Sequence, residues 1–251
     1  MSEASAVYWM WKRELIRFFR AKSRILGSLG MPFLFLAILG TGLNNAINIP
    51  GYSGSYLQFM APGIIAMTLL FTSIFSGVIV IMDRQFGFLK ETLVSPVNRS
   101  SIVIGKSIGG ATAAVIQGIL MLIIAVALGM PINWIMLLPA LAVMMLISMS
   151  FVSLGLAMAS TMEDMQGFQL IMNFLVMPLF FLSGAVFPLS SAPQIVQYIA
   201  YIDPLTYGVE ALRFLLLGYT IIPIYISIVV LLLFFALTTG VAVHLFNRIE
   251  N

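Results

Sequence analysis

The chain has 251 residues, of which 61% are hydrophobic and 8% are charged, with a mean hydropathy of +1.08. A soluble domain usually carries about 25% charged residues, so this composition excludes a soluble globular protein and predicts an integral membrane protein. The chain has no cysteine, which excludes disulfides and thiolate metal sites, and its one histidine, His244, excludes a site that needs two. We therefore predict no metal site.

Residues 7–24 predict an amphipathic helix at the N-terminus. Four arginines recur at i, i+4, i+7 and i+11 and share one face: Arg13, Arg17, Arg20 and Arg24. Aromatic and aliphatic side chains cover the opposite face, a pattern typical of a helix in the lipid headgroup layer. The arginines would face anionic lipid or a partner, or would only anchor the topology. The apolar run that follows is longer than the roughly 7–15 residues of a signal-peptide core, so we expect no cleavage.

Six apolar segments are long enough to cross a bilayer, which takes about 20 helical residues. Two loops rich in Gly, Asn and Pro, at residues 42–55 and 129–133, divide the longest uncharged stretches. The predicted spans lie near residues 25–43, 58–82, 104–128, 134–160, 168–187 and 221–246. The expected fold is therefore a single all-α membrane domain over residues 1–251 with six transmembrane helices.

The basic residues predict the orientation of these spans. With six spans, both termini share one side of the membrane. Eleven of the twelve lysines and arginines fall on that side, and only Arg213 falls on the other. The positive-inside rule then predicts cytoplasmic N- and C-termini in a multi-pass protein of the plasma (inner) membrane.

The connection between spans two and three, residues 83–106, carries six charged residues between two uncharged stretches of more than fifty residues. Within it, residues 84–94 predict about three helical turns, because two Phe and two Leu side chains are spaced mostly along one side. Ser95-Pro96 ends this helix, since the residue before a proline is disfavoured in the helical region. A plain solvated loop is the alternative.

Part of this connection resembles a nucleotide-binding motif. Gly105-Lys106-Ser107 resembles the end of a phosphate-binding loop, but the first glycine of that motif would have to be residue 100, which is Ser. We expect no ATP site in this chain and interpret Lys106 as an interfacial residue at the start of span three. The small residues that follow in that span predict close helix packing inside the protein.

The connection between spans five and six predicts two short helices that enter the membrane part-way from the outer face, over residues 194–217. Residues 194–202 form an amphipathic piece, Asp203-Pro204 breaks it, and residues 205–217 are helical again. Glu210 and Arg213 are spaced i, i+3 and can pair. We expect loss of this pair to alter export more than abundance. An ordinary surface loop is the alternative.

The spans carry no visible machinery for energy coupling or catalysis. Charged residues inside spans usually mark function, and we find none near the middle of the six. No H-E-x-x-H or G-x-S-x-G motif occurs. The chain is therefore not expected to be an enzyme, and energy for uphill transport would come from another chain.

Several features together resemble the membrane permease subunit of ABC-2 type exporters, in the subgroup of daunorubicin-resistance and nodulation-factor export permeases. They are the basic N-terminal helix, the six spans, and the sequences FGFLKETLVSPVNRSSIVIGK (86–106), SGAVFPL (183–189) and DPLTYGVEALR (203–213). The resemblance implies a translocation path for a hydrophobic or lipid-linked substrate: a drug-like compound, a lipid or a glycolipid. An ion-coupled secondary transporter or a channel, acting without an ATPase, is the alternative.

The resemblance also implies partners: a separate ABC ATPase subunit that holds ATP and Mg, a second permease copy in a homodimer, and membrane lipids. It implies no cofactor on this chain and no nucleic acid. Residues 84–94 would be a cytoplasmic coupling helix seated on the ATPase, with Glu91 as its acidic contact. The expected ATPase contacts are Arg84, Phe86, Gly87, Leu89, Lys90, Glu91 and Thr92. The outer helices would form a gate with Asp203, Pro204, Tyr207, Glu210 and Arg213.

Overall fold

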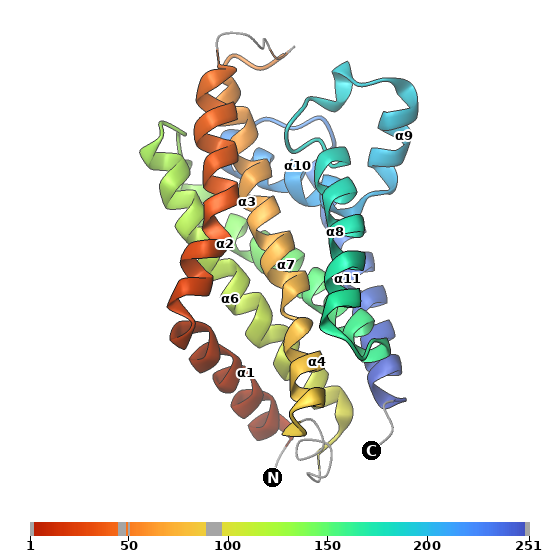
Figure 1. Cartoon of the computed structure of the whole chain (residues 1–251). Helices are drawn as coiled ribbons and strands as arrows, with labels where there is room; N and C mark the ends of the chain where they lie inside the picture. Colours follow the sequence, from red (N-terminus) through yellow and green to blue (C-terminus); the bar gives the residue numbers. More distant parts are fainter. Residues whose placement is uncertain (1–2, 45–48, 50, 89–96, 249–251) are drawn as a thin grey trace.

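The computed structural model describes residues 3–44, 49, 51–88 and 97–248, and these residues form helices and connections without a strand. The helices form an elongated bundle (Figure 1). Both the first helix and the last helix reach the start of α6 (Arg99–Ala127): Glu3 accepts a hydrogen bond from the Asn98 side chain at 2.9 Å, and Arg99 donates to the Asn247 carbonyl at 2.8 Å. We call this end of the bundle the terminal face and the opposite end the distal face.

The prediction of an all-α protein with six spans is confirmed. Six helical stretches of the described residues are long and apolar enough to cross a membrane. They are α2 (Lys22–Leu34) with the π-helix η1 (Phe35–Gly40), α3 (Tyr56–Phe75) with α4 (Val78–Gln85), α6, the 3-10 helix η2 (Trp134–Met136) with α7 (Leu137–Thr161), α8 (Met165–Leu182), and α11 (Ile224–Asn247).

The amphipathic helix at the N-terminus is shorter at its C-terminal end than predicted. Helix α1 (Glu3–Arg20) ends at Arg20, and Ala21 leaves the helical region with φ −92° and ψ 57°. The chain turns there and starts the first span at Lys22. Arg24 therefore belongs to the first turn of α2 and does not share one helix face with the other three arginines.

The predicted helix over residues 84–94 is wrong at its start. Arg84 is the penultimate residue of α4, so it ends the second span instead of beginning a new helix. Phe86 follows as the C-cap, and Gly87 has φ 80°, a conformation that favours glycine. The rest of the prediction, including Leu89, Lys90, Glu91 and Thr92, lies outside the described residues.

Helix α6 owes its close contacts to its small residues, as predicted. A Cβ atom added at Gly105 would lie 2.6 Å from the Cβ atom of Met10, and one added at Gly109 would lie 2.6 Å from the Cβ atom of Glu14. These distances are too short for side chains, so the two glycines allow α1 to cross directly over α6. The crossing fixes which side of α1 faces the bundle.

The distal face contains two short helices with almost the predicted bounds, α9 (Gln194–Ile202) and α10 (Pro204–Leu217), after the short 3-10 helix η3 (Leu189–Ser191). Most of α10 is buried, and it packs against α3, α7 and α11. Span five ends earlier than predicted, at Leu182, because the chain turns at Gly184 with φ 71°. Residues 183–187 thus form part of the distal connection.

Candidate functional site

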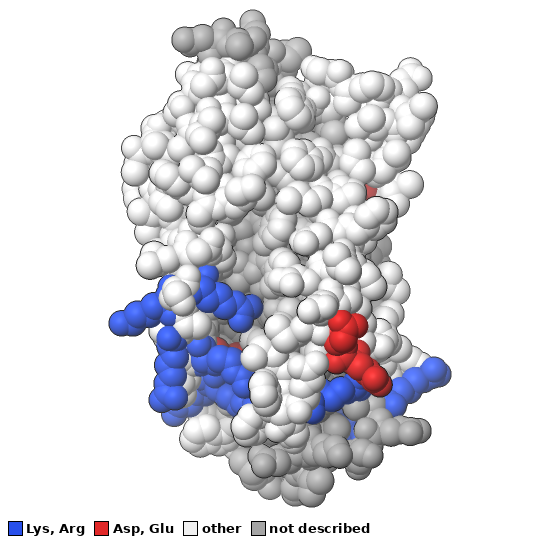
Figure 2. Space-filling view, viewed as in Figure 1, with Lys and Arg blue, Asp and Glu red and all other residues white. Residues whose placement is uncertain are grey.

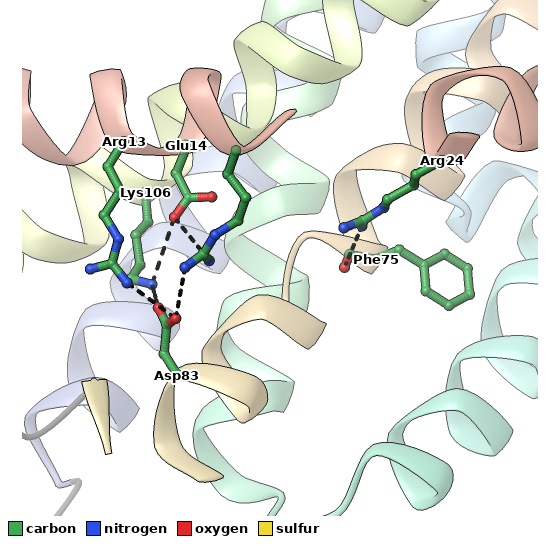
Figure 3. A network of polar contacts seen from close by, with 7 residues as sticks. Arg13, Glu14, Arg24, Phe75, Asp83 and Lys106 are labelled. Atoms are coloured by element: carbon green, nitrogen blue, oxygen red, sulfur yellow. Dashed lines mark hydrogen bonds and ion pairs between the residues drawn. The ribbon is translucent and has the colours of Figure 1, made fainter. Parts of the chain in front are cut away.

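An ionic cluster at the terminal face joins α1, α4 and α6. Asp83 of α4 has only 4% of its side chain exposed, and its Oδ2 accepts a hydrogen bond from Lys106 Nζ at 2.8 Å. Its Oδ1 accepts from Arg17 at 3.0 Å and from Arg13 at 3.2 Å (Figure 3). One buried carboxylate therefore holds the N-terminal helix against two of the spans.

Lys106, which we expected as an interfacial residue at the start of span three, is a buried partner in this cluster. Its side chain is 3% exposed, with Glu14 of α1 at 3.9 Å as a second carboxylate. The residue lies seven positions after Arg99, about 10 Å along α6 from the helix start. A buried lysine requires such partners, because an unpaired charge in this position would be costly.

A cavity of about 520 Å³ opens beside the cluster, between α1, α2, α3, α4, α6 and α8. This volume lies within the range of small-molecule sites, about 300–1,000 Å³. Its apolar wall includes Met31, Met67, Phe71, Phe75, Met82, Met165 and Met177. Its polar lining includes Glu14, Arg17, Arg24, Ser28, Thr72, Gln117 and Gln169. The cavity thus combines a flexible apolar wall with polar groups. The three charged residues of its lining come from α1 and the start of α2.

Gln117 is a buried polar residue of the cavity lining. It is 2% exposed, its Oε1 accepts from the Thr72 hydroxyl, and its Nε2 donates to the Ser28 hydroxyl. This buried amide links α6 to α3 and to α2. The sequence search for charged residues in the spans missed Gln117, because its side chain is polar but uncharged.

Arg24 is the cavity arginine with the fewest partners. Its Nη2 donates one hydrogen bond, to the backbone oxygen of Phe75 at 3.4 Å. Within the described part of the chain, no carboxylate lies within 4.0 Å of its guanidinium. Figure 2 shows basic side chains gathered over α1 and the start of α2, at the terminal end of the bundle.

Arg84, one of the expected ATPase contacts, caps the end of a neighbouring helix. Its two terminal nitrogens donate to the backbone oxygens of Ser160 at 3.3 Å and Met162 at 3.2 Å, at the end of α7. Phe86 and Phe88, which follow, are 68% and 50% exposed. The described part of this connection therefore combines an anchored arginine with two exposed aromatic rings.

At the distal face, Glu210 and Arg213 form the ion pair that their spacing predicts, and both side chains are 1% exposed. Arg213 also donates to the Gly184 carbonyl at 2.9 Å and stacks over the Phe59 ring at 3.9 Å. Glu210 accepts from the Ile221 amide at 2.6 Å. The structure thus brings together the segments 183–189 and 203–213. The pair fastens α10 to α3, to the turn at Gly184 and to the loop that follows α10.

Asp203 and Tyr207 hold the corner between α9 and α10. Asp203 is the N-cap of α10, where its Oδ1 accepts from the Leu205 amide at 2.8 Å, and its buried Oδ2 has no partner. Burial raises the pKa of Asp203 to about 7. The Tyr207 hydroxyl donates to the Tyr201 carbonyl at 2.7 Å. Pro204 is the first residue of α10, a position that suits proline.

Sequence reasoning also missed Asp83 and Glu14 of the buried cluster and the burial of Lys106. Asp83 and Lys106 mark the two ends of the charged connection, and their opposite charges at the ends of consecutive spans are a signal for pairing. Glu14 is the one acidic residue among the arginines of α1. The described residues hold no group of three His, Cys, Asp or Glu side chains that could bind a metal ion.

Six helical stretches of the described residues that are long and apolar enough to cross a membrane define a multi-pass membrane protein. The family model of the ABC-2 type transporter matches residues 5–217. The chain belongs to this family, as its sequence resemblance predicts, and is a membrane transporter permease.

Named relatives agree with this assignment. Nodulation protein J of Rhizobium leguminosarum bv. viciae is 30% identical over 251 residues, which covers 98% of this chain and 96% of the relative. The protein of the same name from R. leguminosarum bv. trifolii is 29% identical over 86% of this chain and 82% of the relative. The putative transport permease ycf38 of Cyanophora paradoxa is 30% identical over 81% of this chain and 71% of the relative.

Proposed function

We propose that the chain is the permease subunit of an ATP-driven exporter and that it moves a hydrophobic or lipid-linked substrate. Two copies would form the path, each coupled to a separate ATPase subunit that binds ATP and Mg. The terminal face would lie in the cytoplasm and the distal face outside the plasma membrane. The family and the asymmetry of the basic residues, which gather at the terminal face, support this arrangement.

The observation that carries the coupling proposal is the end of α4. Asp83 connects this helix to α1 and α6, Arg84 connects it to α7, and the exposed rings of Phe86 and Phe88 follow at once. An ATPase that binds the exposed rings would act on a helix that is fixed to three others. Glu91, which lies outside the described residues, remains our proposed acidic contact.

The test is co-purification of the permease from native membranes in mild detergent. We expect a soluble ATPase in a stoichiometric amount. Phe86→Ser should reduce its recovery, whereas Phe187→Ser, which removes another exposed ring from the distal connection, should not. Glu91→Lys should leave membrane insertion intact and uncouple ATP hydrolysis from transport. Ion-driven transport by the purified chain alone would reject the proposal in favour of a secondary transporter.

A further inference from the structure

We propose that the cavity between α1, α2, α3, α4, α6 and α8 binds an amphiphile with an acidic headgroup. The headgroup would contact Arg24, and the apolar part would lie along the methionine and phenylalanine wall. The shared chemistry is a phosphate, sulfate or carboxylate attached to an acyl-type chain.

The charges at the cavity favour an anion. The cavity lining contains Arg17, Arg24 and Glu14, and the adjoining cluster adds Arg13, Lys106 and Asp83. The lining and the cluster together therefore carry a formal excess of two positive charges. Both carboxylates already have cationic partners within the cluster. A guanidinium has five N–H donors, and Arg24 uses one of them, on a backbone oxygen. The remaining donors match the two-oxygen geometry of a phosphate or carboxylate.

The cavity wall favours a flexible apolar group rather than a small soluble anion. Methionine supplies much of this wall, and its unbranched thioether adapts to chains of different shape. A free inorganic anion would contact Arg24 and leave the wall unused. An amphiphile would fill both parts of the cavity.

The position of Arg24 also fits a lipid headgroup. Span one starts at Lys22, so Arg24 lies in its first turn, at the level expected for headgroups. The cavity continues from there to Met67 and Gln117, which lie well inside their spans. An amphiphile in the inner leaflet would therefore meet its charge partner and its apolar contacts at the appropriate depths.

Two sources could supply this ligand: an acidic phospholipid of the bilayer or an acidic amphiphile that is exported. The binding site itself rests on the cavity and its charges. The identity of the ligand as cargo rests on the proposed export function. The first experiment therefore measures binding to the purified full chain, without an ATPase, so that its failure is distinct from a failure of the export proposal.

The probes are phosphatidylglycerol and phosphatidylcholine with identical acyl chains, and native mass spectrometry counts the lipids retained by the chain. We expect tighter retention of phosphatidylglycerol. Arg24→Gln should weaken it about tenfold, the effect of one charge-assisted hydrogen bond. Lys22→Gln, which removes the same charge from the same helical turn outside the cavity lining, should change it little. Equal retention of both lipids, or equal effects of the two variants, would overturn the proposal.

A second pair of variants tests whether the ligand occupies the cavity. Gly27 lines it, and an added Cβ atom there meets no atom within 4 Å, so Gly27→Phe can fill the space without a clash at Cβ. Gly30 has equally open surroundings on the same helix but is outside the lining. We expect Gly27→Phe, and not Gly30→Phe, to prevent retention. Binding that survives Gly27→Phe unchanged would place the lipid elsewhere and refute the site.

A transport assay in vesicles that contain the permease and its ATPase then shows whether the ligand is exported cargo or a resident bilayer lipid. A cargo lipid with a fluorescent headgroup is moved between leaflets when ATP is added, and Arg24→Gln slows this movement. A resident lipid stays bound through turnover and is not moved. Either result is compatible with the site, and the two assign its ligand to the exported substrate or to the surrounding bilayer.

Discussion

Asp83→Asn is the sharpest test of the buried cluster, because asparagine preserves the shape of the side chain and removes its charge. In this variant Lys106, which is 3% exposed, retains only Glu14 at 3.9 Å as a carboxylate partner. Breaking one partner out of a buried pair costs about 3–5 kcal/mol. We expect the free energy of unfolding to fall by about 3 kcal/mol, near the lower limit of this range, because Glu14 still offsets part of the Lys106 charge.

The two arginines should contribute much less than Lys106. Their side chains are 34% and 37% exposed, and ion pairs with this exposure are worth about 0–1 kcal/mol. Arg13→Gln is therefore the matched control: it also removes a contact with Asp83 but should cost less than about 1 kcal/mol. The free energy of unfolding can be measured by titration with SDS in mixed micelles, followed by circular dichroism.

The double variant Asp83→Asn/Lys106→Met tests whether the lost stability comes from the Asp83–Lys106 ion pair or from a general disturbance of the packing. Removing both charges leaves no unpaired buried ion, so we expect it to recover most of the loss, with a coupling energy of about 2 kcal/mol. The buried pair would be refuted if the losses of free energy of unfolding in the two single variants simply add in the double variant, or if Asp83→Asn lowers the free energy of unfolding by less than about 1 kcal/mol.

Three further predictions follow from the distal face and the exposed spans. Arg213→Met leaves Glu210 buried without its cationic partner, so we expect the free energy of unfolding to fall by about 3–5 kcal/mol. An immunoblot of membranes should then show less of this variant than of the wild-type protein. This burial reverses our expectation from the sequence that export would suffer more than abundance. The raised pKa of Asp203 means that the folded state favours its neutral carboxyl, so the free energy of unfolding falls as pH rises from about 4 to 7. Asp203→Asn should therefore stabilise the protein more at pH 8 than at pH 5, by roughly 2 kcal/mol in thermal unfolding. Equal effects at the two pH values would contradict this prediction. Phe174 of α8 is 85% exposed, and the chain contains no cysteine. If the two copies of the proposed homodimer meet along α8, Phe174→Cys should cross-link them, whereas Leu237→Cys on α11 should not.

The spans and the distal helices could be predicted because their signals are local. Hydropathy alone marks six apolar segments, and Asp203-Pro204 divides α9 from α10 where proline and an N-cap must divide them. The Glu210–Arg213 pair was also predictable, since i, i+3 spacing on one helix brings the side chains together. Its complete burial depends on α3 and the loop at Gly184, which the local pattern does not contain.

The terminal cluster could not be predicted from the same signals, because it depends on how one helix crosses another. The spacing of Arg13 and Arg17 indicates a basic face but not its direction. The crossing of α1 over Gly105 and Gly109 turns that face toward Asp83 instead of leaving it free for lipid. The hydrogen bonds of Arg84 could not be predicted for a related reason, since its partners are the terminal carbonyls of a helix about 80 residues away.

The cluster and the cavity are parts of one arrangement, because α1 belongs to both. Glu14 and Arg17 line the cavity, and Arg17 also binds Asp83 of α4 at 3.0 Å. Helix α4 is separated from α3 by the turn at Ser76 and Gly77, where Gly155 of α7 packs against the backbone. The contact of Asp83 with Arg17 therefore links the connection after α4 to the charged lining of the site that we assign to an acidic amphiphile.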